Sequence, residues 1–178
     1  MITLMMWLIG FMFVVCVLII LVAVHMVRDG RKIQKLMYKD TKMDIWNLNY
    51  LIYWGEHKML PERNEKYAVV YVNLAQFRRY NVIYGWNAGE SLLEGVAGIL
   101  MKNVDKEDEI CARDQGDHFV FLLQYEDAEK FRMRIMEIKG EVEEWILKET
   151  DNRMLLQMGI YYLPKESKDL RLAISYAN

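Results

Sequence analysis

Proline, cysteine and glycine are all scarce in this chain of 178 residues, which has two prolines, two cysteines and ten glycines. Such low counts exclude a collagen-like or low-complexity chain, and two cysteines cannot build a disulfide framework. The formal net charge of -2 excludes the strongly basic surface with which proteins bind duplex nucleic acid. With 53% hydrophobic residues, the chain instead has enough apolar side chains for one packed domain and an additional segment.

Charged residues are entirely absent before Arg28. Residues 4–27 read LMMWLIGFMFVVCVLIILVAVHMV, and at about 1.5 Å per residue a helix of this length crosses roughly 30 Å of hydrocarbon. A cleaved signal peptide would need a basic start and a shorter apolar stretch, and a buried core helix would need a polar face. We therefore predict a transmembrane anchor at residues 1–27, followed by a helical stalk at residues 28–39.

The orientation of this anchor follows from the basic residues after it, which are Arg28, Arg31, Lys32 and Lys35. Basic residues flanking a span stay on the cytoplasmic side of the membrane. We therefore expect a single-pass protein of the inner (cytoplasmic) membrane, in contact with the lipid bilayer, whose C-terminal domain is cytoplasmic. In that reducing compartment no disulfide is expected.

The rest of the chain alternates between patterns typical of helices and of strands. Helices are predicted at 47–60, 74–84, 88–101, 126–150 and 169–177, strands at 67–72, 109–113, 118–124 and 155–163, and a loop at 62–66. This order predicts the α+β class: a ferredoxin-like (palm-type) sandwich with an antiparallel-rich sheet, preceded by one N-terminal transmembrane helix.

Two neighbouring strand tips of such a sandwich would carry the chemistry. The first strand ends at Asn73, and the hairpin between the second and third strands turns through Gln115 and Gly116 to Asp117 and His118. Carboxylates at these tips could hold Mg²⁺ against a triphosphate. Only Asp117 supplies a carboxylate here, because Asn73 is uncharged and an imidazole is a poor ligand for a hard cation.

Three blocks of this sequence resemble the GGDEF domains, which make cyclic di-GMP from two GTP molecules. RDQGDHF at 113–119 is similar to the family signature R-x-G-G-D-E-F, and it ends in Phe119. NLAQFRRYNVIYGWNAGESLL at 73–93 resembles D-x-D-x-F-K-x-x-N-D-x-x-G-H-x-x-G-D-x-x-L, and residues 40–51 weakly resemble D-x-L-T-G-L-x-N. The resemblance covers residues 40–178 and implies a GGDEF-like domain there.

The departures from the family pattern are at the residues on which the family's chemistry depends. Asn73 replaces the metal-binding aspartate, Gln115 the first glycine of the signature, and His118 its glutamate. The resemblance therefore implies a degenerate metal site at Asp117 and Asn73 and a degenerate signature from Gln115 to Phe119, so that no catalytic residue is assigned and little or no cyclase activity is expected. The product-inhibition motif R-x-x-D reads KEDE at 106–109.

A GGDEF-like domain that has lost catalysis can still bind guanine. The resemblance implies that Asn81 and Glu90, the latter in place of an aspartate, bind the base of GTP, with Mg²⁺ as a weakly held cofactor at most. The alternatives are structural: Asn81 caps a turn, Glu90 solvates the start of a helix, and Asp117 binds local backbone. Arg113 is expected to pair with an acidic side chain rather than with phosphate.

Two functional hypotheses follow from the resemblance. The first is a membrane-anchored, catalytically degenerate GGDEF-like module that acts in cyclic di-GMP signalling as a regulatory or GTP-binding domain; the second is an active diguanylate cyclase with a relaxed signature. We expect the domain to be truncated at its C-terminal end, with self-association or a following EAL-type phosphodiesterase domain as further partners. An RNA-recognition motif is a third alternative, which requires Tyr71, Phe119 and Phe121 to point outward as stacking platforms.

Overall fold

The computed structural model describes residues 2–59, 66–105, 107–167 and 169–178. The chain divides into two compact units, residues 1–37 and residues 38–178. The first is made by helix α1 (Ile2–Tyr38), which is continuous through the predicted stalk. The predicted transmembrane span is not confirmed, because no helix among the described residues is both long enough and apolar enough to cross a membrane.

The second unit contains the remaining helices and strands. In chain order they are β1 (Trp46–Asn47), α2 (Leu48–Trp54), the π-helical turn η1 (Gly55–Met59), β2 (Lys66–Leu74), α3 (Phe77–Tyr84), α4 (Trp86–Lys102), β3 (Ile110–Arg113), β4 (Phe119–Tyr125), α5 (Ala128–Thr150), β5 (Leu156–Tyr162) and α6 (Leu170–Ala177). Each predicted helix and strand of this unit is present, with small shifts at its ends. The predicted loop at 62–66 lies almost wholly outside the described residues.

The five strands form one sheet in the order β1-β3-β4-β2-β5. Strand β4 lies at its centre and pairs antiparallel with β3 and with β2, while β2 pairs antiparallel with β5 on its other side. Strands β2 to β5 and the helices between them thus have the β-α-β-β-α-β arrangement of a ferredoxin-like sandwich. Strand β1, which was not predicted, adds a short parallel edge beside β3.

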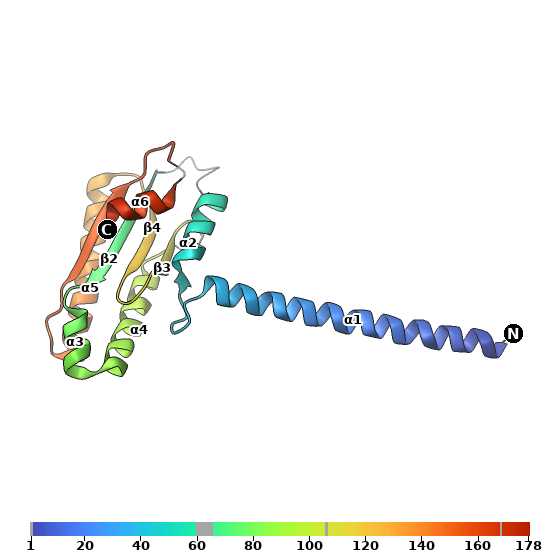
Figure 1. The fold of residues 1–178 in the computed structure, drawn as a ribbon. Coiled ribbons are helices and arrows are strands. Elements are labelled where there is room, and N and C mark those ends of the chain that lie inside the picture. The colour runs from blue at the N-terminus through green and yellow to red at the C-terminus, as the bar shows by residue number, and fades with distance from the viewer. Residues whose placement is uncertain (1, 60–65, 106, 168) are drawn as a thin grey trace. The chain divides into compact units, whose positions relative to one another are not determined.

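Helices cover both faces of this sheet (Figure 1). The alternation of side chains along β2 sends Tyr67, Val69 and Tyr71 toward α2 and α6, and sends Ala68, Val70 and Val72 toward α4 and α5. Each face therefore has its own apolar core. Helix α6 packs especially closely on β5, because a Cβ added at Gly159 would lie 1.8 Å from the carbonyl oxygen of Ala177.

The same alternation excludes the RNA-stacking alternative. Phe119 and Phe121 share one face of β4, as period-two alternation requires, but both are fully buried in the core beneath α4 and α5. Tyr71 lies on the opposite face and is only 6% exposed. None of these three rings is available to stack on a base.

Capping side chains explain where several helices begin. Asn47, Asp127 and Asp169 precede α2, α5 and α6, and each side chain accepts a hydrogen bond from a backbone N–H in the first turn of its helix. These bonds satisfy N–H groups that have no partner within the helix. The sequence thus sets the start of these three helices.

Candidate functional site

The turn between β3 and β4 carries the signature residues, and Arg113 holds its shape. Its Nε and Nη2 atoms donate to the carbonyl oxygen of Gly116 at 3.0 and 2.6 Å, and its Nη1 donates to Asp40 Oδ1 at 3.2 Å. Gly116 has a φ of 57°, a left-handed conformation that glycine adopts without strain. Arg113 is 6% exposed, so its guanidinium is buried and stabilises the turn. Its bond to Asp40 confirms the expected pairing with an acidic side chain.

A pocket of about 260 Å³ lies beside this turn. Its lining includes the predicted base-binding residues Asn81 and Glu90 together with Gln115 and Gly116 of the signature. These residues come from α3, α4 and the β3–β4 turn, and Asp40 and Lys42 also line the pocket, so the three blocks of the sequence that resemble the family meet in one place. The volume suits a nucleobase better than a whole nucleotide, since pockets for drug-sized ligands are commonly about 300–1,000 Å³.

Asn81 reaches this pocket from α3 and is only 8% exposed. Its Oδ1 is buried, and no hydrogen-bond partner for it exists among the described residues. A Cβ added at Gly89 would lie 1.8 Å from that Oδ1, so the glycine makes room for the amide. A buried carbonyl oxygen without a partner is costly, and a ligand with N–H groups would satisfy it.

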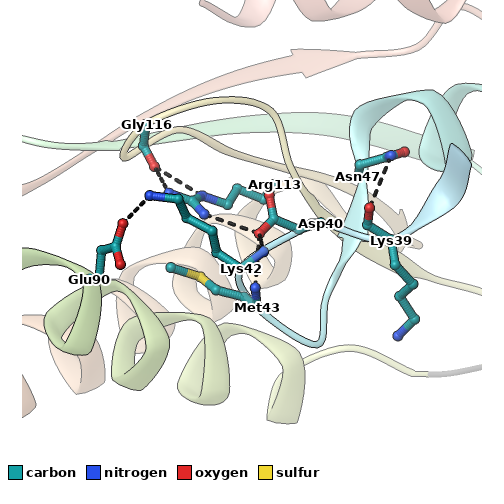
Figure 2. A network of polar contacts seen from close by, with 8 residues as sticks. All are labelled: Lys39, Asp40, Lys42, Met43, Asn47, Glu90, Arg113 and Gly116. Carbon is teal, nitrogen blue, oxygen red and sulfur yellow. Dashed lines mark hydrogen bonds and ion pairs between the residues drawn. The ribbon is translucent and has the colours of Figure 1, made fainter. Parts of the chain in front are cut away.

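Glu90 enters the same pocket from α4, but its carboxylate has a partner. The ammonium group of Lys42 contacts Glu90 Oε1, and Figure 2 shows the pair beside Arg113 and Asp40. Asp40 Oδ1 also accepts hydrogen bonds from the backbone N–H groups of Lys42 and Met43, both at 2.9 Å. The segment after α1 is thereby tied to the signature turn.

Lys42 was not identified from the sequence as a site residue. It stands where the family segment D-x-L-T has leucine, and that substitution of a cation for an apolar residue was the available signal. Its partner Glu90 is 48 positions away, so their contact depends on how α4 packs in the fold.

Asn73, Asp117 and His118 lie apart from this pocket, at the tips of β2 and β4. Asp117 Oδ2 accepts the backbone N–H of Leu74 at 3.2 Å, and its Oδ1 lies 3.8 Å from His118 Nε2. Asn73 Oδ1 and His118 Nδ1 are buried, and within the described part of the chain neither has a hydrogen-bond partner. The structure thus brings the predicted metal-site residues Asn73 and Asp117 together with His118, and two polar atoms of this cluster have no partner among the described residues.

Tyr71 extends this cluster along β2. Its hydroxyl donates to Asp114 Oδ2 at 3.1 Å, and its ring centroid lies 5.4 Å from that of His118. Burial raises the pKa of Tyr71 to about 12, and the negative charges of Asp114 and Asp117 and the hydrogen bond to Asp114 act in the same direction. Tyr71 is therefore a neutral donor at physiological pH.

These strand-tip residues do not fit a Mg²⁺ site for a triphosphate. Magnesium favours octahedral oxygen ligands with carboxylates among them. Asp117 is already bonded to backbone, Asp114 accepts from Tyr71, and Asn73 offers only a neutral oxygen. In the chain as described, no group of three or more His, Cys, Asp and Glu side chains could hold a metal ion.

A second hollow, of about 390 Å³, lies between α3 and the connection from α5 to β5. Its lining includes Arg79, Tyr80 and Arg153 but none of the predicted site residues. The chemistry argued from the sequence therefore belongs to the smaller pocket and the strand tips, even though this hollow is larger.

Comparison of this sequence and structure with known proteins identifies a family that matches most of the chain. The family described as "Diguanylate cyclase, GGDEF domain" matches residues 40–178. A probable diguanylate cyclase of Escherichia coli, DgcT, is 24% identical over 119 residues, which is 67% of this chain and 26% of that protein. The chain therefore spans about a quarter of the length of this curated relative.

Solved structures agree on the fold. The coiled coil and GGDEF domain of DgcB from Caulobacter crescentus, in complex with c-di-GMP, superposes with a TM-score of 0.70 at 16% identity, over 88% of this chain and 85% of that one. The S helix-GGDEF-EAL structure of Vibrio cholerae LapD, bound to c-di-GMP, gives a TM-score of 0.63 at 15% identity, over 85% of this chain and 35% of that one. Together with the match over 40–178, the β-α-β-β-α-β sheet and the signature turn place this chain in the GGDEF domain family.

Proposed function

We propose that this chain is a regulatory GGDEF domain that binds the guanine base of GTP and does not make cyclic di-GMP. The observation that carries the proposal is the separation between two parts of the site. The pocket keeps a buried amide at Asn81 and a carboxylate at Glu90, whereas the strand tips have Asn73 and His118 in place of anionic ligands.

Guanine matches the polar groups of this pocket. Its N1–H and N2–H₂ groups are adjacent donors, and its O6 and N7 atoms are acceptors. The Glu90 carboxylate can accept from the donors, and the Asn81 amide can bind at a neighbouring position on the purine edge. Phosphoryl chemistry lacks comparable support, because preorganised charge near the phosphates is usually the largest contribution to such catalysis, and removal of one such contact costs about 3 kcal/mol.

The test of binding compares two glycines of the same helix. Gly89→Ala pushes a methyl group into the Asn81 side chain, whereas Gly98→Ala meets nothing within 4 Å. Calorimetric titration of GTP into the full chain should show binding in the wild type and in Gly98→Ala and at least a tenfold loss in Gly89→Ala. Equal binding in all three proteins would place the nucleotide elsewhere, and no binding in the wild type would refute the proposal.

Restoring the signature tests the loss of catalysis. The triple variant Asn73→Asp, Gln115→Gly and His118→Glu should convert GTP to cyclic di-GMP, detected by chromatography, while the wild type makes none. Adding Gly89→Ala to the triple variant is the matched control and should remove the product again. Product from the wild type would instead support the alternative, an active diguanylate cyclase with a relaxed signature.

A regulatory GGDEF domain needs a protein to regulate. LapD joins a GGDEF domain to an EAL domain in one chain, and a comparable partner for this chain, or a second copy of it, is part of the proposal. Analytical ultracentrifugation of the full chain with and without GTP tests self-association. Unchanged sedimentation over a wide range of protein concentrations would count against the second copy.

We also propose, from the sequence alone, that the chain is attached to the cytoplasmic membrane with its GGDEF domain in the cytoplasm. The apolar residues 4–27 and the basic residues that follow them support this location. Extraction of membranes at alkaline pH tests it, since an attached chain stays in the pellet. Release into the supernatant would contradict the attachment.

A further inference from the structure

The contact between Lys42 and Glu90 lies at the pocket that the proposed function assigns to guanine. Both residues belong to the lining of this pocket, and the Lys42 ammonium group contacts Glu90 Oε1 (Figure 2). The Lys42 side chain is 57% exposed and that of Glu90 is 40% exposed. The pair is thus reachable by solvent and by a ligand that enters the pocket.

This contact competes with base recognition. Guanine binds a carboxylate through two hydrogen bonds when its N1–H and N2–H₂ groups donate to the two oxygens. One of these oxygens, Oε1, is the atom that the Lys42 ammonium group contacts. A purine that binds Glu90 through both oxygens therefore competes with Lys42 for Oε1.

The backbone around Lys42 is held, so only its side chain has to move. Asp40 accepts from the backbone N–H of Lys42 and binds Arg113, which in turn binds the Gly116 carbonyl oxygen. This chain of hydrogen bonds anchors the segment beside the pocket. The lysine stem beyond the backbone has four carbons and rotates freely, which lets the ammonium group leave Glu90 without disturbing the turn.

We propose that Lys42 is a gate for the base pocket, closed when its ammonium group pairs with Glu90 and open when the side chain turns into solvent. The inference rests on the proposed function, since it concerns access to the same pocket. It adds a residue that regulates binding and sets its salt dependence. The segment that carries the gate directly follows α1 in the sequence.

Guanosine is the appropriate probe, because it has the base but no phosphate that Lys42 could attract. Calorimetric titration compares the full-length wild type with Lys42→Met, which keeps the stem and removes the charge. The matched control is Lys39→Met, whose amine pairs with Asp44 outside the pocket lining at 3.0 Å. We expect about two- to five-fold tighter binding of guanosine to Lys42→Met, as the release of an exposed ion pair allows, and no change for Lys39→Met.

Two further measurements identify the cause of this gain. Adenosine lacks adjacent donors on the corresponding edge, so its binding should not improve in Lys42→Met. Raising the salt concentration from about 0.05 to about 0.5 M screens the exposed pair and should tighten guanosine binding to the wild type while leaving the variant unchanged.

The possible failures are distinguishable. If the wild type and Lys42→Met bind guanosine equally, or if the variant binds more weakly, the gate is overturned and the proposed function stands. If neither protein binds guanosine or GTP, both proposals fail. An equal gain for adenosine would also overturn the gate, because the released Glu90 carboxylate would not be the cause.

Discussion

Two polar clusters of this domain differ in how completely their hydrogen bonds are satisfied. Around Glu109, both carboxylate oxygens accept from Arg134 at 2.6 and 2.7 Å and also from the backbone N–H groups of Asp105 and Gln124. At the strand tips, Asn73 Oδ1 and His118 Nδ1 are buried, and the described residues offer neither of them a hydrogen-bond partner.

The difference separates scaffold from site. A buried ion pair contributes to stability only when the geometry is good and every polar atom has a partner, as around Glu109. Unsatisfied buried atoms cost free energy and are found where a ligand or an altered function explains them. The strand tips are therefore the part of this domain where a ligand could satisfy polar atoms that the described residues leave without partners.

The largest expected loss of stability comes from removing the carboxylate at the centre of the Glu109 cluster. Glu109→Ala leaves two backbone N–H groups without their acceptor and the Arg134 guanidinium without its carboxylate partner, although Nη2 still donates to the Asn103 carbonyl oxygen. The variant should lower the free energy of unfolding by about 3 kcal/mol. Urea unfolding of the full chain, followed by tryptophan fluorescence, measures this loss. Glu129→Ala is the control, because Glu129 is 82% exposed and its partner Arg132 is 66% exposed.

A loss below about 1 kcal/mol in Glu109→Ala, or an equal loss in both variants, would show that the Glu109 cluster is not a stabilising part of the scaffold. Glu109→Ala and Glu129→Ala each remove one negative charge, so a difference between them reports burial and hydrogen bonding rather than net charge.

Much of the fold could be predicted from the sequence because its signals are local. Helix α4 shows its apolar face at helical spacing, and β2 shows a buried run of aromatic and β-branched residues. Strand β1 could not be predicted, since two residues are too few to show an alternation. The predicted transmembrane span is the element that the described residues do not confirm.

The site was predictable only where a motif marks it. The signature pattern located Gly116 and Asp117, and the upstream block located Asn81 and Glu90. The Lys42–Glu90 pair joins residues 48 positions apart, and such a contact has no local signal. It depends on how the segment after α1 and helix α4 meet beside the turn.

The effect of Tyr71→Phe on the pH dependence of stability tests the strand-tip cluster. The pKa of Tyr71 is raised from 10.0 to about 12 in the folded chain, so its contribution to stability is full below pH 10 and is lost as the pH rises toward 12. At neutral pH the variant should lose about 1 kcal/mol with the hydrogen bond to Asp114. Above pH 10 the wild type should lose stability more steeply than Tyr71→Phe.

Unfolding curves between pH 8 and about 11.5 measure this difference. Tyr176→Phe is the control, because Tyr176 is 60% exposed and the Phe ring keeps its contact with Tyr161. Parallel curves for the wild type and Tyr71→Phe would mean that burial and Asp114 do not raise the pKa of Tyr71 in solution.

The smallest effect is expected where the structure already leaves an atom unsatisfied. Asn73→Ala removes a buried oxygen that lacks a partner among the described residues, so the free energy of unfolding should change by less than about 0.5 kcal/mol. Asn103→Ala is the matched comparison, because its Nδ2 donates to Ile99 O at 3.0 Å and to Glu141 Oε2 at 2.9 Å, and its loss should cost about 1 kcal/mol. If Asn73→Ala were the more destabilising of the two, the Asn73 amide would have a structural partner, and the strand tips would belong to the scaffold.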